Sequence, residues 1–442
     1  MMREARMQIG FGKVNVSPPP EGGGEMDLRI LGFWYEREKR YGPIRDPLYA
    51  RAMAVEAAGS RACLIAVDMI GDSIGFSEEA RTEIQKREGL TAEAVMIACT
   101  HCHTSPETIG LTDHPVDARW RRQLVHGIAD AASQAFSSLR PARLFLREGP
   151  LPGVAFNRCS ANKDCVARLG EEARKRYAFL DETLRLASTE FKDGAPAGLA
   201  VNFACHPVGF QTQPFISADY PGVLVHSLEQ TGGPALFANG PCGDVDPVRY
   251  RNSADVQWTG DEMVRRAREL LDTAPPAEIS GGIRGARRLV PLQRRPLRGP
   301  EELRRLEAET LAALAGAGPV DPDHWERTPH RRLYEIQQEL ALTRLPGTIT
   351  AELHALEIGE WLILGVPGEL VGCLGQEMRA VARKHRTWVV GYANGYLGYI
   401  PSSASFEAGN YEVRMGRWSR LAPGAGETLR DAAVQLIGEI ER

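Results

Sequence analysis

The sequence lacks an excess of charge of either sign, a long hydrophobic run and the apolar core of a secretion signal. Lysine and arginine total 53, aspartate and glutamate total 57, and the net charge of −4 gives no electrostatic reason to bind a polyanion. Nucleic acid is therefore not an expected partner. No apolar run approaches the ~18 residues of a transmembrane helix, and residues 1–7 do not resemble a signal peptide. We expect a cytoplasmic protein with no transmembrane segment.

Cysteine is scarce as well, with eight residues in a chain of 442. Several lie within apolar runs, such as Cys63 in the segment 62–65 and Cys99 after the segment 95–98. Cysteines in such surroundings are most often buried free thiols, and we expect that state here. The composition, with 43% hydrophobic and 25% charged residues, is otherwise that of a globular protein with a large core.

Short apolar runs and longer amphipathic stretches alternate along the chain, which predicts an α/β fold. The expected strands are 8–16, 61–68, 94–100, 198–204, 234–238, 349–358, 361–366 and 387–392. The expected helices are 77–88, 117–138, 252–273, 300–317, 331–342 and 368–384. The segment 46–58 fits a helix or a strand, because its apolar residues also alternate. We expect residues 1–442 to form one large domain, with a mixed sheet and flanking helices.

One segment interrupts this pattern. Residues 284–298 are rich in arginine and proline and are expected to be a solvated linker. With the helical segments that follow, they make 284–345 a linker or a helical excursion from the domain. An anionic partner for the arginines is less favoured, because glycine and proline interrupt them and acids lie nearby.

The most informative residues are histidines at the ends of predicted strands. His101 and His103 follow the run 94–100, and residues two apart on a strand point to the same face. His206 ends the run 198–204 in the same way. In α/β sheets, ligands collect beyond the carboxyl ends of strands, and converging imidazoles suit a metal ion. Each histidine alone could equally be a strand-end residue whose hydrogen bonds are satisfied locally.

Acidic residues follow apolar runs at similar places, namely Asp68, Asp244, Asp246 and Glu369. Each also has a structural interpretation: Asp244 suits a turn, and the helix dipole favours Glu369 in a first helical turn. The sequence contains no His-Glu-x-x-His motif and no Gly-x-Gly-x-x-Gly or Walker loop. The remaining histidines do not follow the order expected of a TIM-barrel amidohydrolase.

A series of short motifs follows in order along nearly the whole chain. They are Val-Asn-Val-Ser-Pro-Pro at 14–19, Asp-Pro-Leu-Tyr-Ala-Arg-Ala at 46–52, Thr-His-Cys-His-Thr-Ser-Pro at 100–106, Asn-Arg-Cys at 157–159, His206, Ser-Ala-Asp-Tyr-Pro-Gly at 217–222, Gly-Asp-Val-Asp-Pro at 243–247, Pro-Gly-Glu at 367–369, Asn394 with Tyr396 and Tyr399, and Tyr411 with Glu412. Each motif is short, but their ordered sum is specific. Together they resemble the catalytic N-terminal domain of the neutral (non-lysosomal) ceramidase family.

The resemblance implies one zinc ion per chain, with the ligands His101, His206, Glu369 and Tyr399. Such a set leaves one position for a water molecule, whose pKa the zinc lowers, and lets the metal polarise an amide carbonyl. The resemblance also implies that His103 takes the proton of this water or hydrogen-bonds to the developing oxyanion. Arg158 and Tyr411 would donate to the oxyanion and to the substrate.

The chain departs from the family pattern beside these residues. Cys102, the pair at 104–105, Cys159 and Asp246 replace the residues usual in the family. Full-length members carry a C-terminal immunoglobulin-like domain and a secretion signal, and we expect this chain to have neither. Because of these departures, the resemblance predicts the metal site and the reaction class better than it predicts the substrate.

We therefore expect a ceramidase-like zinc hydrolase that cleaves a linear N-acyl amide, and this amide need not be ceramide. The expected partner is a small-molecule amide whose acyl chain enters an apolar pocket. One alternative is an esterase or lactonase with the same metal site, and another is a ligand-binding pseudoenzyme. Asp244 and Asp246 either bind a second, structural cation or only stabilise a turn, and the sequence leaves both interpretations open. The head group, the acyl-chain length and the oligomeric state are not predicted.

Overall fold

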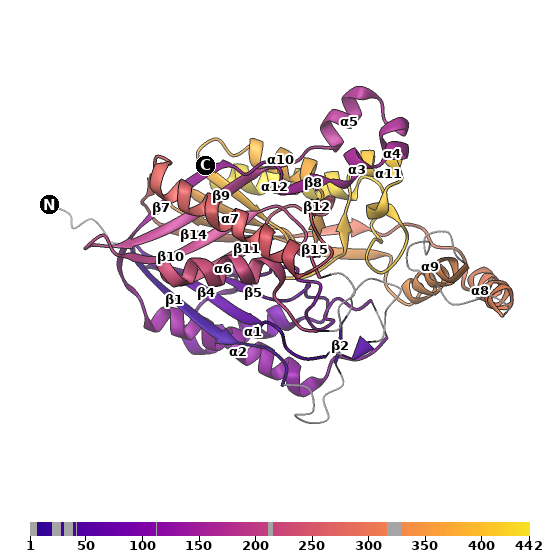
Figure 1. Cartoon of the computed structure of the whole chain (residues 1–442), viewed down its shortest axis with the longest axis horizontal. Coiled ribbons are helices and arrows are strands. Elements are labelled where there is room, and N and C mark those ends of the chain that lie inside the picture. The colour runs from indigo at the N-terminus through magenta and orange to yellow at the C-terminus, as the bar shows by residue number, and fades with distance from the viewer. Residues whose placement is uncertain are drawn as a thin grey trace.

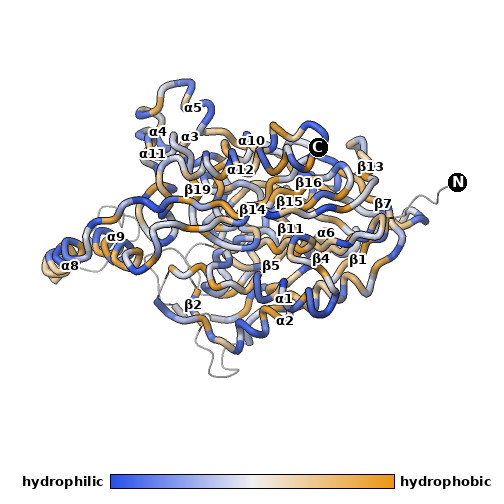
Figure 2. Tube along the Cα trace, turned by 180° about the vertical axis from the view of Figure 1, so that it is seen from behind, coloured by the Kyte–Doolittle hydropathy of each residue, from blue (hydrophilic) through white to orange (hydrophobic). Residues whose placement is uncertain are grey.

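Two β-sheets lie face to face at the centre of the molecule, with helices on both outer sides (Figure 1). This computed structural model describes residues 7–19, 28–30, 39–40, 42–111, 113–210, 215–315 and 329–442. Hydrophobic residues are concentrated in the central strands, whereas helices α8 and α9 mix hydrophilic and hydrophobic residues (Figure 2). The predicted α/β fold is confirmed, and its strands divide into two stacked sheets.

The first sheet has nine strands. In spatial order they are β11 (Ala235–Asn239), β10 (Pro196–Phe203), β9 (Thr183–Phe191), β7 (Arg140–Pro150), β1 (Gln8–Asn15), β4 (Tyr49–Ala57), β5 (Ser60–Val67) and β6 (Val95–Cys99), with β13 (Ala277–Ile279) paired to β7. The pairs β10–β11 and β5–β6 are parallel, and the other pairs are antiparallel. The ambiguous segment 46–58 thus contains a strand, and β7 and β9 were not predicted.

The second sheet has four strands. They are β14 (Ile283–Gln293), β15 (Thr348–Ile358), β16 (Trp361–Gly365) and β18 (Arg386–Val390), and only the pair β16–β18 is parallel. Residues alternate between the two faces of β5: Leu64 contributes to the core shared with Leu356 and Ile363, whereas Cys63 and Ile65 face the helices. Burial on both faces explains why β5 is a continuous apolar run.

Helices cover the outer face of each sheet. Those packed in the core of the first sheet are α1 (Phe76–Glu88), α2 (Ala118–Ser137), α6 (Asp219–Gly232) and α7 (Ser253–Thr273). Those packed on the second sheet are α10 (Gly372–Ala380) and α12 (Ala425–Ile440). The remaining elements are β2 (Arg29–Ile30), β3 (Lys39–Arg40), η1 (Ala92–Ala94), β8 (Ala155–Asn157), α3 (Arg158–Ala161), α4 (Lys163–Arg168), α5 (Glu171–Tyr177), β12 (Val245–Pro247), α8 (Pro300–Leu314), α9 (Pro329–Leu342), β17 (Glu369–Leu370), β19 (Tyr399–Ile400), α11 (Ser403–Ala408) and η3 (Tyr411–Val413).

Helix α2 shows how individual residues set the start of a helix and its distance from the sheet. Asp117 caps its start by accepting hydrogen bonds from the backbone N–H groups of Arg119 and Trp120. The helix lies directly on β1, where a Cβ atom at Gly10 or Gly12 would come within about 2.1 Å of an α2 backbone carbonyl oxygen. Because only glycine permits this approach, the two glycines set the distance between helix and sheet.

The expected linker at 284–298 is wrong over most of its length, because these residues form β14. Its arginines pair with acids of other elements: Arg284 with Glu357, Arg287 with Glu93 and Glu352, and Arg288 with Glu439. The expected helical excursion is present as α8 and α9, which project from one end of the molecule (Figure 1). Residues 316–328 of that excursion lie outside the described part of the chain.

Two further expectations need correction. The segment 368–384 is not one helix, since β17 precedes α10. Cys159 and Cys165 form a disulfide bond rather than remaining free thiols, whereas the other six cysteines are free and buried. A search of the described helices for a stretch long and apolar enough to cross a bilayer finds none.

Candidate metal centre

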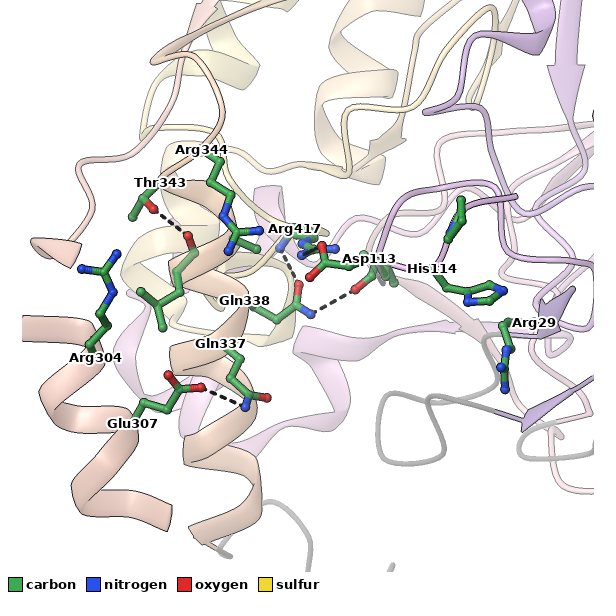
Figure 3. A pocket seen from close by; sticks show the side chains of 14 residues that line it. Arg29, Asp113, His114, Arg304, Glu307, Gln337, Gln338, Thr343, Arg344 and Arg417 are labelled. Carbon is green, nitrogen blue, oxygen red and sulfur yellow. Dashed lines mark hydrogen bonds and ion pairs between the residues drawn. The ribbon is translucent and has the colours of Figure 1, made fainter. Parts of the chain in front are cut away.

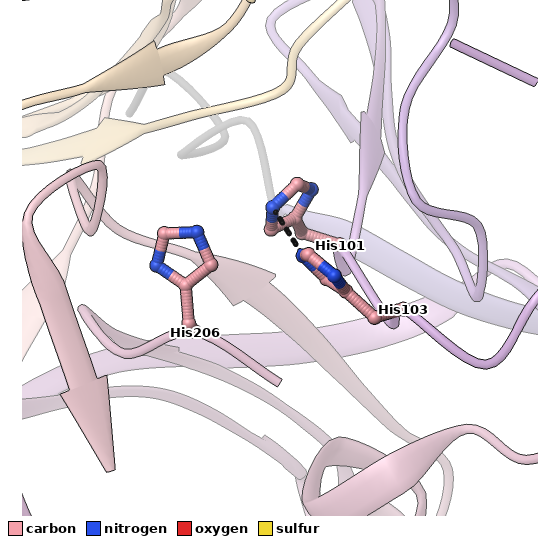
Figure 4. A group of neighbouring side chains, drawn as sticks. All are labelled: His101, His103 and His206. Carbon is pink, nitrogen blue, oxygen red and sulfur yellow. Dashed lines mark hydrogen bonds between the residues drawn. The ribbon is translucent and has the colours of Figure 1, made fainter. Parts of the chain in front are cut away.

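The ends of two strands bring three histidines together. His101 and His103 follow β6, and His206 follows β10 (Figure 4). Asn239, the last residue of β11, donates one amide hydrogen to the carbonyl of Thr100 at 3.1 Å and the other to that of Cys205 at 3.0 Å. These carbonyls immediately precede His101 and His206, so a single buried side chain fixes both strand ends relative to each other.

Backbone carbonyls orient the rings of His101 and His206. Nδ1 of His101 lies 2.5 Å from the carbonyl oxygen of Ile70, and Nδ1 of His206 lies 3.1 Å from that of Val245. A carbonyl can only accept, so each Nδ1 carries a hydrogen and each Nε2 is the atom directed into the centre. This orientation by a backbone acceptor is typical of histidines that bind metals. His101 also has a φ of 70°, a strained value that often marks functional sites.

The Nε2 atoms converge on one place. Nε2 of His101 lies 3.1 Å from Nε2 of His103, and one ligand atom from each of the three histidines lies within 4.8 Å of the others. Oε2 of Glu369 lies 3.0 Å from Nε2 of His206 and 3.6 Å from Nε2 of His101. The sequence prediction that the histidines share one site is confirmed, and Glu369 joins them.

Glu369 and Tyr399 come from the short parallel pair β17–β19, where they lie directly opposite each other. The hydroxyl of Tyr396 donates a hydrogen bond to Oε1 of Glu369. The hydroxyl of Tyr399 instead accepts a hydrogen bond from Nη2 of Arg158 at 3.3 Å, and its ring lies 6.5 Å from that of His206. The tyrosine expected as a ligand is thus at the site, while its neighbour Tyr396 makes the direct contact with the carboxylate.

Arg158 reaches the same place from the end of β8. Nε of Arg158 donates to Oε1 of Glu412 at 2.9 Å, and Nη1 lies 3.3 Å from Oδ1 of Asp246. Its guanidinium carbon lies 5.5 Å from the ring centroids of both Tyr399 and Tyr411. Glu412 has an exposed fraction of 0%, so it is a fixed anchor that holds Arg158 in orientation.

Burial and charge set the protonation states of the centre. Burial lowers the pKa of His101 to about 3 and that of His103 well below its usual value. Burial opposes ionisation of Glu369, but its contacts with His101, His206 and Tyr396 prevail and lower its pKa to about 2. Burial opposes protonation of His206 as well, but Cys242 and the hydrogen bond to Glu369 prevail and raise its pKa. A divalent metal ion requires neutral imidazoles beside an ionised carboxylate, so its binding would release a proton from His206.

The histidine trio is the single group of three or more potential metal ligands that the described residues form. Both oxygens of Asp244 accept hydrogen bonds at 2.7 Å, one from Asn157 and one from the backbone of Gly372. Asp246 faces Arg158, as above. Asp68 pairs with Arg51 at 2.6 Å and accepts a hydrogen bond from the hydroxyl of Thr100 at 3.4 Å. In the described residues these acids therefore brace the structure, and a second cation near Asp244 and Asp246 stays an untested expectation.

Several residues of the centre had no assigned role in the sequence analysis. Tyr396 and Glu412 belong to motifs quoted above, but nothing in the sequence distinguishes Tyr396 from Tyr399, or shows that Asn239 joins two strands. Tyr392, stacked on His101 at 4.0 Å, was likewise not assigned.

Two further short motifs also occur, and the structure gives them no catalytic geometry. Cys99 and Cys102 have the Cys-x-x-Cys spacing, yet both are buried and free. Ser73 stands in a Gly-x-Ser-x-Gly sequence, but its hydroxyl donates to the carbonyl of Tyr396 at 3.0 Å rather than to a histidine. A nucleophile of the serine-hydrolase type would need such a base.

Comparison of the sequence with curated proteins finds distant relatives. Neutral ceramidase B of Dictyostelium discoideum is 21% identical over 508 residues, which cover 92% of this chain and 69% of that protein. Neutral ceramidase 2 of Arabidopsis thaliana is 25% identical over 290 residues, which cover 62% of this chain and 36% of that protein. The matched region thus spans little more than a third of the plant relative.

Comparison of the structure finds the same fold. A crystal structure of neutral ceramidase from Pseudomonas aeruginosa superposes with a TM-score of 0.74 at 20% identity, covering 98% of this chain and 74% of that one. A structure of a ceramidase complexed with C2 gives the same TM-score and identity, with 99% and 75% coverage. Residues 7–245, more than half of the chain, match the sequence model described as neutral/alkaline non-lysosomal ceramidase, N-terminal. The chain belongs to the neutral/alkaline non-lysosomal ceramidase family.

Proposed function

We propose that this protein is a zinc-dependent hydrolase that cleaves the amide bond of a linear N-acyl compound. The observation that carries the proposal is the convergence of His101, His206 and Glu369, which come from distant parts of the chain, on one buried point. Family membership supports the reaction class, because the relatives are named ceramidases and ceramide is an N-acyl amide. The proposal leaves open which N-acyl amide is cleaved.

The donor set fits zinc. Two imidazoles whose Nε2 atoms lie within 3.6 Å of one carboxylate oxygen form a set of nitrogen and oxygen donors of the kind that zinc binds. We propose Tyr399 as the fourth ligand, and Tyr396 as the residue that orients Glu369. A zinc ion in this position supplies a Lewis acid for the amide carbonyl and lowers the pKa of water to near neutrality.

The other residues supply proton transfer and charge stabilisation. His103 has a low pKa and is half-buried rather than fully buried, so its neutral imidazole can accept a proton from water at the site and return it to the departing amine. Arg158 and Tyr411 donate hydrogen bonds to the oxygen that gains negative charge as water adds to the carbonyl carbon. Glu412 keeps Arg158 in the required orientation.

The proposal is tested by metal analysis of the purified protein followed by assays with N-acyl amides of different chain lengths. We expect about one zinc per chain and turnover of at least one amide. A matched series of esters assays the alternative esterase activity on the same preparations. Stoichiometric zinc with turnover of esters alone would contradict the amide assignment, and protein that binds no zinc would contradict the proposal as a whole.

A further inference from the structure

Tyr396 connects the candidate metal centre to a cleft at the base of the helical excursion. Its ring lines a cavity of about 520 Å³ between the loop 394–397 and the end of α9. A second cavity, of about 810 Å³, adjoins it between α8, α9 and the segment after the histidine pair (Figure 3). The two share Asp113, Ala341, Arg344 and Arg417 in their walls. We call the two cavities together the arginine cleft, and their volumes suit a small molecule.

Every acidic side chain in the walls of the arginine cleft already has a partner. The acids are Asp72, Glu78, Asp113 and Glu307. Their partners are, in the same order, the backbone N–H groups at the start of α1, Arg81, Arg417 and Gln337. Asp72, Glu78 and Asp113 are thus held by backbone N–H groups or by other arginines, whereas Glu307 is held by a neutral amide.

Three arginines of the cleft have no such partner. The guanidinium groups of Arg304, Arg344 and Arg420 make no hydrogen bond or ion pair with the described residues. Arg304 lies on α8 and Arg344 follows the end of α9, and both line the larger cavity (Figure 3). Among the described residues, no carboxylate therefore pairs with these three guanidinium groups.

Arg420 is the most informative of the three. It is half-buried, its Nε is fully buried without a hydrogen-bond partner, and burial together with the nearby Arg294 lowers its pKa. Nε of Arg294 is buried and unpartnered as well, and the side chain donates only to the carbonyl of Leu342 among the described residues. Two desolvated guanidinium groups without an acid repel each other, so an anion placed beside them would be strongly attracted.

We propose that the arginine cleft binds a small molecule through a carboxylate or phosphate group, with Arg420 and Arg344 as its principal contacts. The planar fork of a guanidinium matches both groups, since it donates two parallel hydrogen bonds to a pair of oxygens. The anion belongs either to one end of the hydrolysed amide or to a separate molecule. The first of these origins rests on the proposed function, and the anion site itself does not.

Inorganic phosphate tests the site directly. We measure the thermal midpoint in phosphate and in chloride at equal ionic strength, for the wild type, Arg420→Met and Arg332→Met. Arg332 is the matched control, because it is exposed on α9 and does not line the cleft. We expect phosphate to raise the midpoint of the wild type and of Arg332→Met, but not that of Arg420→Met.

A structural role for Arg420 makes a different prediction. In chloride alone, Arg420→Met should unfold at the same temperature as the wild type or higher, since the substitution removes repulsion of Arg294. Arg344→Gln provides a second variant whose exposed side chain is not needed for folding, and it should weaken phosphate binding about tenfold through loss of a charged hydrogen bond. The absence of a phosphate effect in the wild type, or its persistence in both variants, would overturn the proposal.

A pair of substrates identifies where the anion comes from. We compare an N-acyl amino acid with its carboxamide, which lacks the charge. A raised KM for the acid alone in Arg344→Gln assigns the cleft to the substrate, whereas unchanged KM values with lost phosphate binding assign it to a separate anion. If neither compound is hydrolysed, the result counts against the proposed function, while the phosphate measurement still tests whether the arginine cleft binds an anion.

Discussion

The metal centre and the arginine cleft lie on two sides of Tyr396 and are built in opposite ways. In the centre, Nδ1 of His101 and Nδ1 of His206 each face a backbone carbonyl, and the carboxylate of Glu369 is held by a tyrosine hydroxyl. In the cleft, Arg344 and Arg420 have neither an acid nor a carbonyl to hold them among the described residues. The first site is preorganised by the protein, whereas the second is charged and incompletely paired.

This difference indicates which property each site is built for. A metal ion needs fixed donor atoms, and the fixed rings of His101 and His206 spare the cost of ordering them on binding. An anion needs unbalanced positive charge, which the protein can keep only near its surface. Substitutions at the metal donors, at the proton acceptor and behind the histidines test whether the centre is preorganised in this way.

Removal of a donor should have the largest effect. Glu369→Ala and His101→Ala should each lose zinc and lower kcat/KM by about 10³-fold or more, because a metal contributes several kcal/mol to barrier lowering. Metal content and hydrolysis are measured on the same preparations. Glu172→Ala is the control, since the side chain of Glu172 is 91% exposed on α5. Full zinc content in both donor variants would show that the ligand assignment is wrong.

Removal of the proton acceptor should separate chemistry from metal binding. His103→Ala should keep its zinc but lose about 10²- to 10⁴-fold in kcat, the usual contribution of a general base. The control is His226→Ala, an exposed histidine of α6. If kcat is unchanged in His103→Ala, then this histidine takes no part in the reaction, and if zinc is lost as well, it is a ligand.

Replacement of Asn239, whose side chain joins the two strand ends behind the histidines, tests whether the metal centre is preorganised. Asn239→Ala frees the carbonyls of Thr100 and Cys205 and should weaken zinc binding by about 10- to 100-fold, as loss of outer contacts commonly does. Asn202→Ala is the matched control, because Asn202 is an equally buried asparagine that donates to the carbonyl of Ala238 at 2.9 Å. Equal zinc affinity in the two variants would mean that the hydrogen bonds of Asn239 do not contribute to metal binding.

The parts of the centre that the sequence predicts are those set by local pattern. The apolar runs before His101 and His206 mark strand ends, and strand ends meet at one edge of a sheet. The motif order then points to Glu369 at the same place. Asn239 could not be foreseen, because its role depends on β11 lying near β6, which follows from the curvature of a nine-stranded sheet.

The errors in the fold have a common physical cause. Strand β14 carries arginines that read as a solvated linker, yet Arg287 is held by Glu93 and Glu352 from elements far away in the sequence. Strand β7 likewise mixes arginines with apolar residues, and it was missed. In both strands the charges are balanced by residues of other elements, and such a balance leaves no periodic pattern in the local sequence.

The smallest predicted effect concerns a buried acid beside the centre. Burial, reinforced by Glu412, raises the pKa of Asp244 to about 7, although hydrogen bonds from Gly372 and Asn157 oppose the shift. An aspartate in the unfolded chain has a pKa near 3.8, so the folded state binds this proton more tightly. The resulting stabilisation is complete below about pH 4 and is lost as the pH rises through about 7.

Asp244→Asn removes this titration and should flatten the dependence of unfolding free energy on pH between about 4 and 7. The measurement is denaturant unfolding at several pH values, and the slope is compared rather than the absolute stability, since the amide also changes one hydrogen bond. Asp246→Asn is the control, because Asp246 is more exposed and faces Arg158. A wild-type slope in Asp244→Asn would mean that Asp244 is ionised in the fold, with its charge compensated by a further donor or by a second cation near Asp246.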